Sequence, residues 1–347
     1  MSYSSRERTE GSAENETLFS AAWPERGRKL IIQIPCYNEA ASLLITLQAL
    51  PRELPGIGHI EWLIVDDGST DQTVEVARAN KVDHIVNLPR HQGLARAFMV
   101  GIEASLRAGA DIIVNTDADN QYRAEDIPRL IAPILAGSAE IVIGARSISE
   151  IQHFSPVKKW LQRLGSWVVR LASKADIPDA PSGFRALSRD AAMQLHVFND
   201  YTYTLEMVIQ AGQKGMAITS IPVRTNADLR PSRLVKSIPG YIRKQVLTIL
   251  RIFMTYKPFQ FFAVPGILLF SCGVLIGIRF LYFYVTDGGS GHVQSLILAS
   301  LFLSTGFFLS IIGLLADLIA VNRKLLEGLD WRIQKMEEEV TKRKREE

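Results

Sequence analysis

Residues 111–121 read DIIVNTDADNQ, a short apolar run that ends in two aspartates. The run is rich in β-branched residues and is followed by turn-forming residues, which is typical of a buried strand. Asp117 and Asp119 come after that strand, and Gln121 follows them closely. Carboxylate and amide oxygens are the hard ligands that Mg2+ prefers. The stretch therefore predicts a metal-binding turn at the carboxyl end of a strand; the alternative is a polar turn that only caps the strand.

The same pattern of an apolar run followed by polar residues recurs on both sides of this strand. Strands are expected over residues 30–35, 61–65, 84–88, 111–116 and 140–144. Helical patterns lie between them, over residues 38–50, 71–79, 93–108 and 124–136. Such alternation indicates a mostly parallel sheet with helices on both faces. Because ligands bind at the carboxyl ends of the strands in such sheets, we expect the functional residues just after each strand.

The composition favours a membrane-bound protein without a nucleic-acid partner. The chain has 347 residues, of which 47% are hydrophobic, a mean hydropathy of +0.10 and a net charge of only +3. So small a net charge does not attract nucleic acid. Cys36 and Cys272 lie far apart, which argues against a disulfide framework and against a zinc site. Residues 1–27 are polar, lack the apolar segment of a secretory signal, and are expected to be a disordered tail.

Two long apolar runs, residues 259–285 and 293–319, are each long enough to cross a bilayer. The connector between them contains no Lys or Arg, whereas Lys257, Arg323 and Lys324 flank the other ends. The positive-inside rule therefore predicts a multi-pass protein of the inner (cytoplasmic) membrane, with the catalytic domain and both termini in the cytoplasm.

Three further segments are amphipathic, over residues 157–171, 235–255 and 321–347. Residues 157–171 combine a helical apolar stripe with a basic face, which fits a helix on an anionic membrane surface or a helix packed on the sheet. Residues 321–347 carry a short heptad seam, which either joins protomers into a homo-oligomer or packs on a neighbouring domain. The expected division of the chain is a tail over residues 1–27, a catalytic domain over 28–231, interfacial helices over 232–257, two spans within 258–320 and a cytoplasmic amphipathic helix over 321–347.

Polar residues also follow the first three expected strands. Tyr37 and Glu39 follow the first strand, where they could flank a nucleoside and bind its ribose or base. Asp66 and Asp67 follow the second strand, where a carboxylate could bind a nucleobase or a ribose. Residues 90–93 follow the third strand and either touch the nucleotide or form ordinary surface. These positions predict a nucleotide site at the same sheet edge as the metal-binding turn.

Taken together, these motifs resemble glycosyltransferase family 2, whose catalytic domains have the Rossmann-like α/β fold called GT-A. Residues 35–39, 66–70 and 117–119 match the family's three donor-side motifs in order, within a resemblance that covers about residues 29–225. The resemblance implies a nucleotide-sugar donor and a Mg2+ or Mn2+ ion that the two aspartates of the turn hold on the donor diphosphate. The donor-site residues that it implies are Pro35, Tyr37, Glu39, Asp66, Asp67, Asp117 and Ala118.

A narrower resemblance is to the polyprenyl-phosphate sugar transferases, which include the dolichyl-phosphate mannosyltransferases and bacterial enzymes that make undecaprenyl-phosphate sugars. It rests on residues 117–121, 144–146 and 179–185, on the basic segment around residue 163 and on the C-terminal pair of apolar runs. This resemblance implies that Gln121 joins the metal shell and that Arg146 and Arg163 receive the lipid phosphate.

A basic segment at residues 224–236 resembles the loop that closes over the donor diphosphate in this group. We expect Arg230 and Arg233 among the donor-binding residues on this ground, and Arg185 from the matching motif over residues 179–185. The group usually has a Ser-Lys pair in this loop, preceded by a glycine, whereas this sequence has Pro231-Ser232-Arg233.

The implied reaction is transfer of one sugar to polyprenyl phosphate by a single displacement with inversion at the anomeric carbon. A lipid phosphate is already largely anionic, so arginines that hold it matter more than a strong base. A divalent cation stabilises the departing nucleoside diphosphate. The expected catalytic residues are Asp119, Arg146, Arg163 and Asp179. Asp179 and Glu206 either orient the acceptor, act as a base or make only structural hydrogen bonds.

Two other functions fit the sequence less well. A processive polysaccharide synthase of the same family would have a Gln-x-x-Arg-Trp motif, which the sequence lacks. A non-catalytic membrane scaffold would not be expected to keep buried carboxylates, because they are costly. The sequence leaves open which sugar is transferred and whether the donor is a UDP- or a GDP-sugar. It also leaves open Mg2+ against Mn2+, since both suit oxygen ligands.

Overall fold

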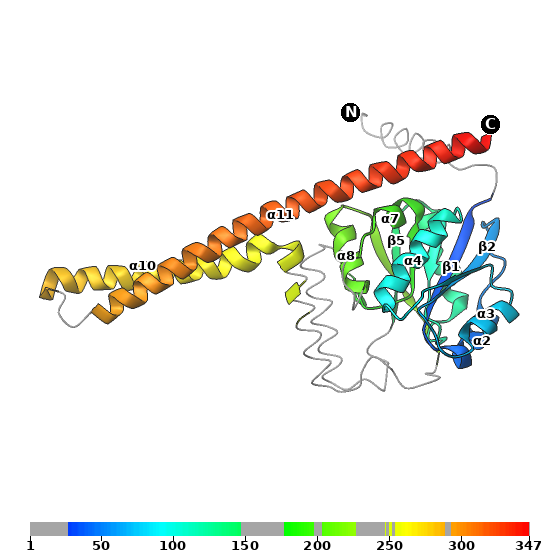
Figure 1. The fold of residues 1–347 in the computed structure, drawn as a ribbon, viewed down its shortest axis with the longest axis horizontal. Helices are drawn as coiled ribbons and strands as arrows, with labels where there is room; N and C mark the ends of the chain where they lie inside the picture. Colours follow the sequence, from blue (N-terminus) through cyan, green and yellow to red (C-terminus); the bar gives the residue numbers. More distant parts are fainter. Residues whose placement is uncertain are drawn as a thin grey trace, which may run out of the picture. The chain divides into compact units, whose positions relative to one another are not determined.

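The computed structural model describes residues 27–146, 177–197, 203–226, 247, 250–251, 254–288 and 293–346. The chain divides into two compact units, Met1–Val235 and Lys236–Glu347, which are described separately. The first unit is an α/β domain built on one sheet, and the second consists of long helices (Figure 1).

A mixed sheet forms the centre of the first unit. Its described strands are β1 (Lys29–Cys36), β2 (His59–Asp66), β3 (His84–Asn87), β4 (Ile112–Asn115), β5 (Ile141–Arg146), β6 (Arg185–Ser188) and β7 (Ile218–Val223). They are ordered β3-β2-β1-β4-β6-β5-β7, and each pair is parallel except those that β6 makes with β4 and β5. The mostly parallel sheet predicted from strand-helix alternation is confirmed.

The expected strands do not include β6 and β7. β6 has only four residues and begins with a buried arginine, so no apolar run marks it in the sequence. β7 lies at the edge of the sheet and is mostly half-buried, and its polar residues and proline dilute the apolar pattern. Both strands are fixed by pairing with strands that are distant in sequence, which local patterns do not reveal.

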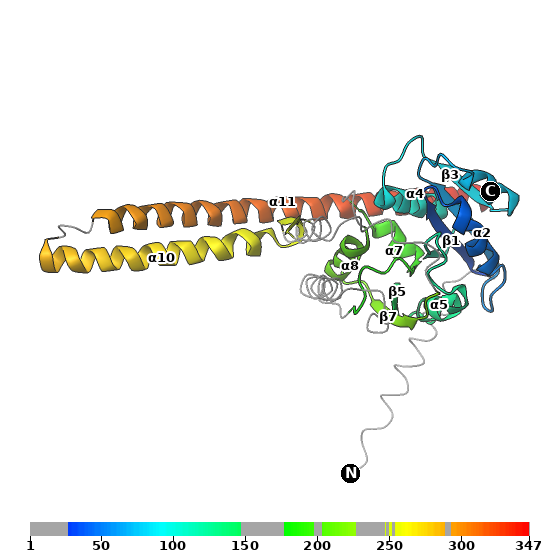
Figure 2. The same cartoon turned by 90° about the horizontal axis from the view of Figure 1, so that it is seen from below.

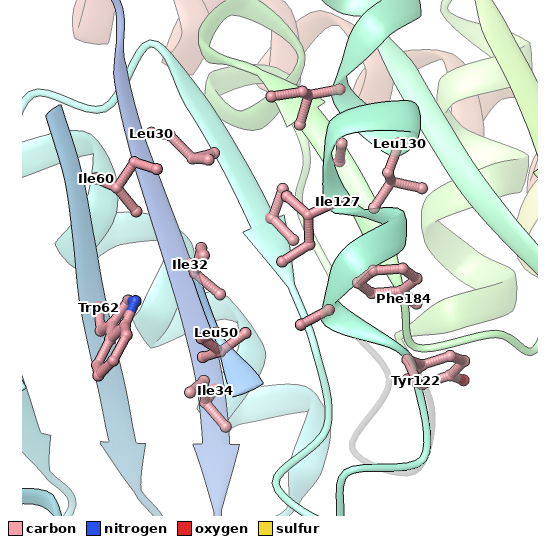
Figure 3. Close-up of a cluster of buried hydrophobic side chains, with 14 of the residues drawn as sticks. Leu30, Ile32, Ile34, Leu50, Ile60, Trp62, Tyr122, Ile127, Leu130 and Phe184 are labelled. Carbon is pink, nitrogen blue, oxygen red and sulfur yellow. The ribbon is translucent and has the colours of Figure 1, made fainter. Parts of the chain in front are cut away.

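Helices cover both faces of the sheet. The helical elements of the domain are α2 (Ala40–Ala49), α3 (Thr73–Ala79), α4 (Leu94–Arg107), the 3-10 turn η1 (Ala124–Asp126), α5 (Ile127–Leu135), α7 (Arg189–Gln194) and α8 (Thr204–Gln213). Side chains alternate between the faces of a strand, so Leu30, Ile32 and Ile34 of β1 share one buried cluster with α2 and α5 (Figure 3). Gln33 of β1 instead faces Gly101 of α4. Each buried aliphatic side chain stabilises this packing by about 1.5–3 kcal/mol.

The strand order reverses between β1 and β4. In doubly wound sheets a ligand binds outside the carboxyl ends of the strands at such a point. Cys36 at the end of β1 pairs in register with Asp66 at the end of β2, and Gln33 pairs with Asn115 at the end of β4. The loops after β1, β2 and β4 therefore begin at one edge of the sheet.

The second unit consists chiefly of α10 (Pro258–Asp287) and α11 (Val293–Glu346), which lie side by side in both views (Figures 1 and 2). Glycines let the two backbones approach closely: a Cβ on Gly306 would lie 2.5 Å from the backbone nitrogen of Phe270. Small residues at such contacts are typical of membrane helices. Both helices are long and apolar enough to cross a membrane, as the two apolar runs predicted.

α11 continues without a break from the second apolar run into the charged C-terminal stretch, 54 residues in all. The expected boundary at residues 320–321 is therefore a change in composition and not the end of a helix. At 1.5 Å per residue the helix is about 80 Å long.

Some expected features lie outside the described residues. They are nearly all of the tail over residues 1–27, the amphipathic helix over residues 157–171 and most of the segment over residues 232–257. These expectations stay predictions.

Candidate active site

The turn over residues 117–121, which is predicted to bind a metal and is called the metal-binding turn for that reason, follows β4 at the edge of the sheet where the strand order reverses. Asp117 and Asp119 are both partly exposed. Asp117 lies against Gly183, because a Cβ on Gly183 would come within 2.8 Å of both carboxylate oxygens. Glycine at 183 therefore lets the segment before β6 approach the aspartate closely, and this explains why the motif over residues 179–185 lies beside the turn.

The two carboxylates of the turn affect one another. Burial raises the pKa of Asp117, and the charge of Asp119 raises it further. The positive charges of Arg146 and Arg185 offset part of this, and the pKa of Asp117 is about 7. A divalent cation between the carboxylates would relieve their mutual repulsion, because an opposite charge favours the ionised form.

The residues of the turn fit a cation that takes its remaining ligands from a substrate. The described part of the chain has no cluster of three or more His, Cys, Asp or Glu side chains that could hold a metal ion. Mg2+ characteristically uses one or two protein carboxylates and completes its shell with phosphate oxygens and water. Asp117 and Asp119, with the amide oxygen of Gln121 nearby, match that donor set. The predicted metal site is thus chemically consistent, and its occupancy stays a prediction.

The turn itself has a defined conformation. Asn120 has a left-handed backbone conformation, with φ of 55°. The backbone N–H of Gln121 donates to Oδ1 of Asp119 over 3.2 Å. The hydroxyl of Thr46 in α2 also donates a hydrogen bond to the turn, to the carbonyl of Ala118 over 2.8 Å. Ala118, predicted to contact the donor, is buried.

Arg146 at the end of β5 joins the turn to a buried carboxylate. Its Nε and Nη2 donate to the two oxygens of Asp179 over 2.7 and 3.0 Å, and its Nη1 donates to Oε1 of Gln121 over 3.3 Å. The side chain of Asp179 is fully buried and that of Arg146 is 10% exposed. Burial alone would lower the pKa of Arg146, but Tyr122 and Asp179 more than offset this and raise the pKa above its ordinary value. The structure thus brings three predicted residues together and favours an orienting role for Asp179.

Arg185 is the first residue of β6. Its side chain is fully buried, and its guanidinium donates to the carbonyls of Ser182, Thr204 and Ala180 over 2.7, 2.9 and 2.5 Å. Burial lowers its pKa. These hydrogen bonds hold the segment over residues 179–184. The predicted contact of Arg185 with the donor stays a prediction. Glu206 is also buried, at 4% exposure in α8.

On the nucleotide side, Tyr37 stacks on His91, with ring centroids 3.9 Å apart and an interplanar angle of 25°. His91 Nδ1 lies 2.8 Å from Oδ2 of Asp67. The backbone N–H groups of Gln92 and Gly93 also donate to Asp67, over 2.7 and 2.9 Å. The buried carboxylate of Asp67 therefore orders the loop after β3. Its predicted contact with the nucleotide stays a prediction.

The loops after β1 and β2 are joined by short polar side chains. The backbone N–H of Asn38 donates to Oγ of Ser69, and that of Thr70 donates to Oδ1 of Asn38, each over 2.8 Å. Asp66 accepts a hydrogen bond from the backbone of Ser69. Glu39 is buried at the start of α2, and its backbone N–H donates to Thr73 over 2.9 Å. Pro35 lies within β1. The predicted donor motifs are thus adjacent in space.

Sequence reasoning missed a buried polar network beneath the turn. Asn115, the last residue of β4, donates to the carbonyl of Gly183 over 2.8 Å and to the hydroxyl of Tyr203 over 3.1 Å. Gln33 of β1 donates to Asn115 over 2.9 Å. The sequence contained a signal for this network, because an amide inside an apolar strand must find a hydrogen-bond partner.

Of the predicted site residues, Arg163, Arg230 and Arg233 lie outside the described ranges.

A largely parallel sheet with paired carboxylates at its carboxyl edge is the arrangement expected of sugar-transferring enzymes with the GT-A fold. Residues 31–195 match the family described as Glycosyl transferase family 2. An uncharacterized glycosyltransferase of Mycobacterium tuberculosis is 31% identical over 203 residues, which are 57% of this chain and 85% of that protein. The chain therefore belongs to glycosyltransferase family 2, as its motifs predicted, and is an enzyme that transfers a hexose.

Two further similarities bear on fold and relatives. An undecaprenyl-phosphate mannosyltransferase of Micrococcus luteus is 27% identical over 223 residues, which are 61% of this chain and 90% of that protein. The crystal structure of glucosyl-3-phosphoglycerate synthase from Mycobacterium tuberculosis, in complex with phosphoglyceric acid, has a TM-score of 0.55 at 21% identity and covers 67% of this chain and 84% of that chain. The structural similarity confirms the predicted GT-A fold, and the sequence similarity places polyprenyl-phosphate sugar transferases among the relatives.

Proposed function

We propose that the protein transfers a single sugar from a nucleotide-sugar to polyprenyl phosphate, with inversion at the anomeric carbon. The observation that carries the proposal is the arrangement at one sheet edge, where the carboxylates of the turn lie beside Arg146 in a chain with two apolar helices of membrane-spanning length. The turn offers a place for the donor diphosphate, and the arginine offers one for an acceptor phosphate. The similarity to an undecaprenyl-phosphate mannosyltransferase supports the same assignment.

The donor side holds a UDP- or GDP-sugar in this proposal. Asp117, Asp119 and Gln121 would hold Mg2+ or Mn2+, which when bound would neutralise charge on the donor diphosphate and on the departing nucleoside diphosphate. Tyr37 offers an aromatic face to the nucleoside, and Asp66 lies next to it at the end of β2. Arg230 and Arg233 are proposed to add positive charge over the diphosphate.

Arg146 is the proposed ligand of the acceptor phosphate. Asp179 engages its Nε and Nη2, so the guanidinium is held in one orientation before the acceptor arrives. Nη1 makes a longer contact with Gln121, 3.3 Å, and this side is the one proposed to meet the phosphate. Arg163 is proposed as a second ligand. A phosphate oxygen is already anionic at neutral pH, so its attack on the anomeric carbon depends on alignment more than on a base.

A membrane-bound enzyme suits a lipid acceptor, and this chain has two helices long and apolar enough to cross a membrane. A polyprenyl chain is apolar, so its phosphate lies at the surface of the bilayer. We propose that residues 258–320 anchor the protein, that the basic helix over residues 157–171 lies on the cytoplasmic surface, and that the catalytic domain over residues 28–231 and both termini are cytoplasmic. Self-association through residues 321–347 is a further proposal, which the mass of the detergent-solubilised protein tests.

The test is to incubate membranes that contain the protein with labelled nucleotide-sugars, Mg2+ and undecaprenyl phosphate, and then to extract the lipid. We expect a glycolipid that carries one sugar and is labile to mild acid. A polymer of repeating sugar would instead indicate a polysaccharide synthase. Failure of a folded protein to transfer sugar from UDP- and GDP-sugars would contradict the proposal. Arg163→Ala should weaken use of the lipid more than binding of the donor, and equal losses would contradict its acceptor role.

A further inference from the structure

The segment after β7, residues 224–226, makes hydrogen bonds to the metal-binding turn. The backbone N–H of Asn226 donates to the carbonyl of Gln121 over 2.8 Å. The side-chain Nδ2 of the same residue donates to the carbonyl of Asn120 over 2.9 Å. One residue therefore binds two consecutive carbonyls, and both belong to the part of the turn where the chain reverses.

Asn120 needs such support. Its φ of 55° lies in the left-handed region, which is unfavourable for most L-residues, although asparagine tolerates it better than most. The reversal at Asn120 places Gln121 so that its N–H binds Oδ1 of Asp119 and its Oε1 lies 3.3 Å from Nη1 of Arg146. If Asn120 returned to a right-handed or extended conformation, the carboxylate of Asp119 and the amide of Gln121 would no longer share this arrangement.

Asn226 is itself held in place. Immediately before it, Thr225 forms an antiparallel bridge with Tyr122. Arg224, one residue earlier, donates from its backbone N–H and from Nη2 to Asp126 over 2.7 and 2.8 Å. The carboxylate of Asp126 is fully buried at the start of α5. The segment over residues 224–226 is therefore fixed by its own hydrogen bonds and supports the turn at Asn120 and Gln121. Thr46 supports the turn separately, at Ala118.

We propose that Asn226 is a positioning residue for the metal site. It fixes the left-handed conformation of Asn120, so that the oxygens of Asp119 and Gln121 face one cation. Asn226 does not itself touch the cation or the substrate in this role. The inference rests on the proposed role of the turn in metal binding, and it adds a residue that lies more than a hundred positions away from the turn in the sequence.

The test compares Asn226→Ala and Asn226→Asp with wild type. The alanine variant removes the side-chain hydrogen bond, and the aspartate variant keeps the shape but loses the donor. Asn80→Ala is the matched control, because Nδ2 of Asn80 also donates to a carbonyl, that of Val76, over 2.8 Å at the end of α3. The purified detergent-solubilised proteins are titrated with Mn2+ in the presence of UDP, and again with GDP, and bound Mn2+ is measured by electron paramagnetic resonance. Hydrogen exchange of the peptide over residues 117–123 is measured without metal.

We expect both Asn226 variants to bind Mn2+ at least about tenfold more weakly than wild type, as losses of supporting groups around metal ligands usually do. Their turn should exchange hydrogen faster, and Asn80→Ala should match wild type in both measurements. Unchanged Mn2+ affinity in both Asn226 variants would overturn the inference, and so would an equal loss in Asn80→Ala.

Two other outcomes separate this inference from the proposed function. Absence of Mn2+ and Mg2+ binding by the wild type would overturn the metal assignment and the role of Asn226 together. The wild type could instead transfer no sugar to polyprenyl phosphate while the Asn226 variants bind Mn2+ more weakly than the wild type. That result would support the role of Asn226 and contradict the proposed acceptor.

Discussion

The proposed donor side and the proposed acceptor side of the site are held together by different kinds of contact. On the donor side, short polar side chains such as Asn38 and Ser69 join the loops after β1, β2 and β3 through many neutral or singly charged hydrogen bonds. On the acceptor side, Arg146 and Asp179 form one buried ion pair. A typical hydrogen bond contributes about 0.5–1.5 kcal/mol, whereas removal of one partner of a buried ion pair costs about 3–5 kcal/mol. The donor side should therefore tolerate single substitutions better than the acceptor side.

The metal-binding turn lies between the halves, and its loss should have the largest effect. Asp119→Ala removes a proposed metal ligand from a partly exposed position, so the fold should survive. We expect sugar transfer to fall on the order of 10³-fold or more, because charge stabilisation of the leaving group is lost. Transfer assays on protein whose thermal unfolding matches wild type check this. Near-normal turnover would mean that the metal assignment is wrong.

On the acceptor side, loss of the Arg146–Asp179 ion pair should destabilise the fold. Asp179→Asn leaves the guanidinium of Arg146 buried without its counter-charge, and we expect a loss of about 3–5 kcal/mol in the free energy of unfolding. Denaturant titration, followed by a spectroscopic signal of the catalytic unit, measures this change in the free energy of unfolding. The double variant Arg146→Met, Asp179→Leu should recover much of that stability without recovering transfer. A single variant as stable as wild type would remove the contrast between the halves.

The donor side should show a smaller effect that is confined to binding. His91→Ala removes the ring that stacks on Tyr37, and aromatic pairs of this kind are worth about 0.5–1.5 kcal/mol. We expect the KM for the nucleotide-sugar to rise by roughly two- to tenfold, with kcat unchanged. His91→Phe, which keeps a ring but loses the contact with Asp67, should lie between. Steady-state kinetics with the donor varied decide this, and a fall in kcat with KM unchanged would contradict the assignment.

The smallest effect should come from Asp126 and Arg224, the pair that supports the turn, because the side chain of Arg224 is 51% exposed and the ion pair is only half buried. Burial raises the pKa of Asp126, but hydrogen bonds from Arg224 outweigh this and lower it below its ordinary value. A carboxyl group whose pKa is lower in the folded state stabilises the fold above its unfolded pKa, about 3.9, and this contribution is lost as pH falls through the folded pKa. Asp126→Asn should therefore be less stable than wild type at neutral pH, and the difference should shrink in acid. Thermal unfolding from pH 7 to pH 3 measures it; a constant difference would contradict the ion-pair account.

The sequence was most informative where local pattern and function coincide. Apolar runs with turn residues predicted β1 to β5, and the turn after β4 was found because two aspartates follow a buried strand. β6 and β7 escaped prediction because long-range pairing, not local pattern, makes them strands. The supporting contacts escaped for the same reason: Asn226 and Asn120 meet only in the fold. Asp67 and Arg185 show what residue type alone does not reveal, since both are buried and hydrogen-bonded within the protein, while their predicted contacts with the donor stay predictions.

In the proposed function, the turn over residues 117–121 holds the donor diphosphate through a divalent cation. Calorimetric titration of UDP and of GDP into the detergent-solubilised protein, with Mn2+ and again with a chelator, tests it directly. We expect one of the two nucleotides to bind with Mn2+, and binding to weaken at least about tenfold on chelation and in Asp119→Ala. Binding that is equally tight with the chelator and in the variant would contradict the claim.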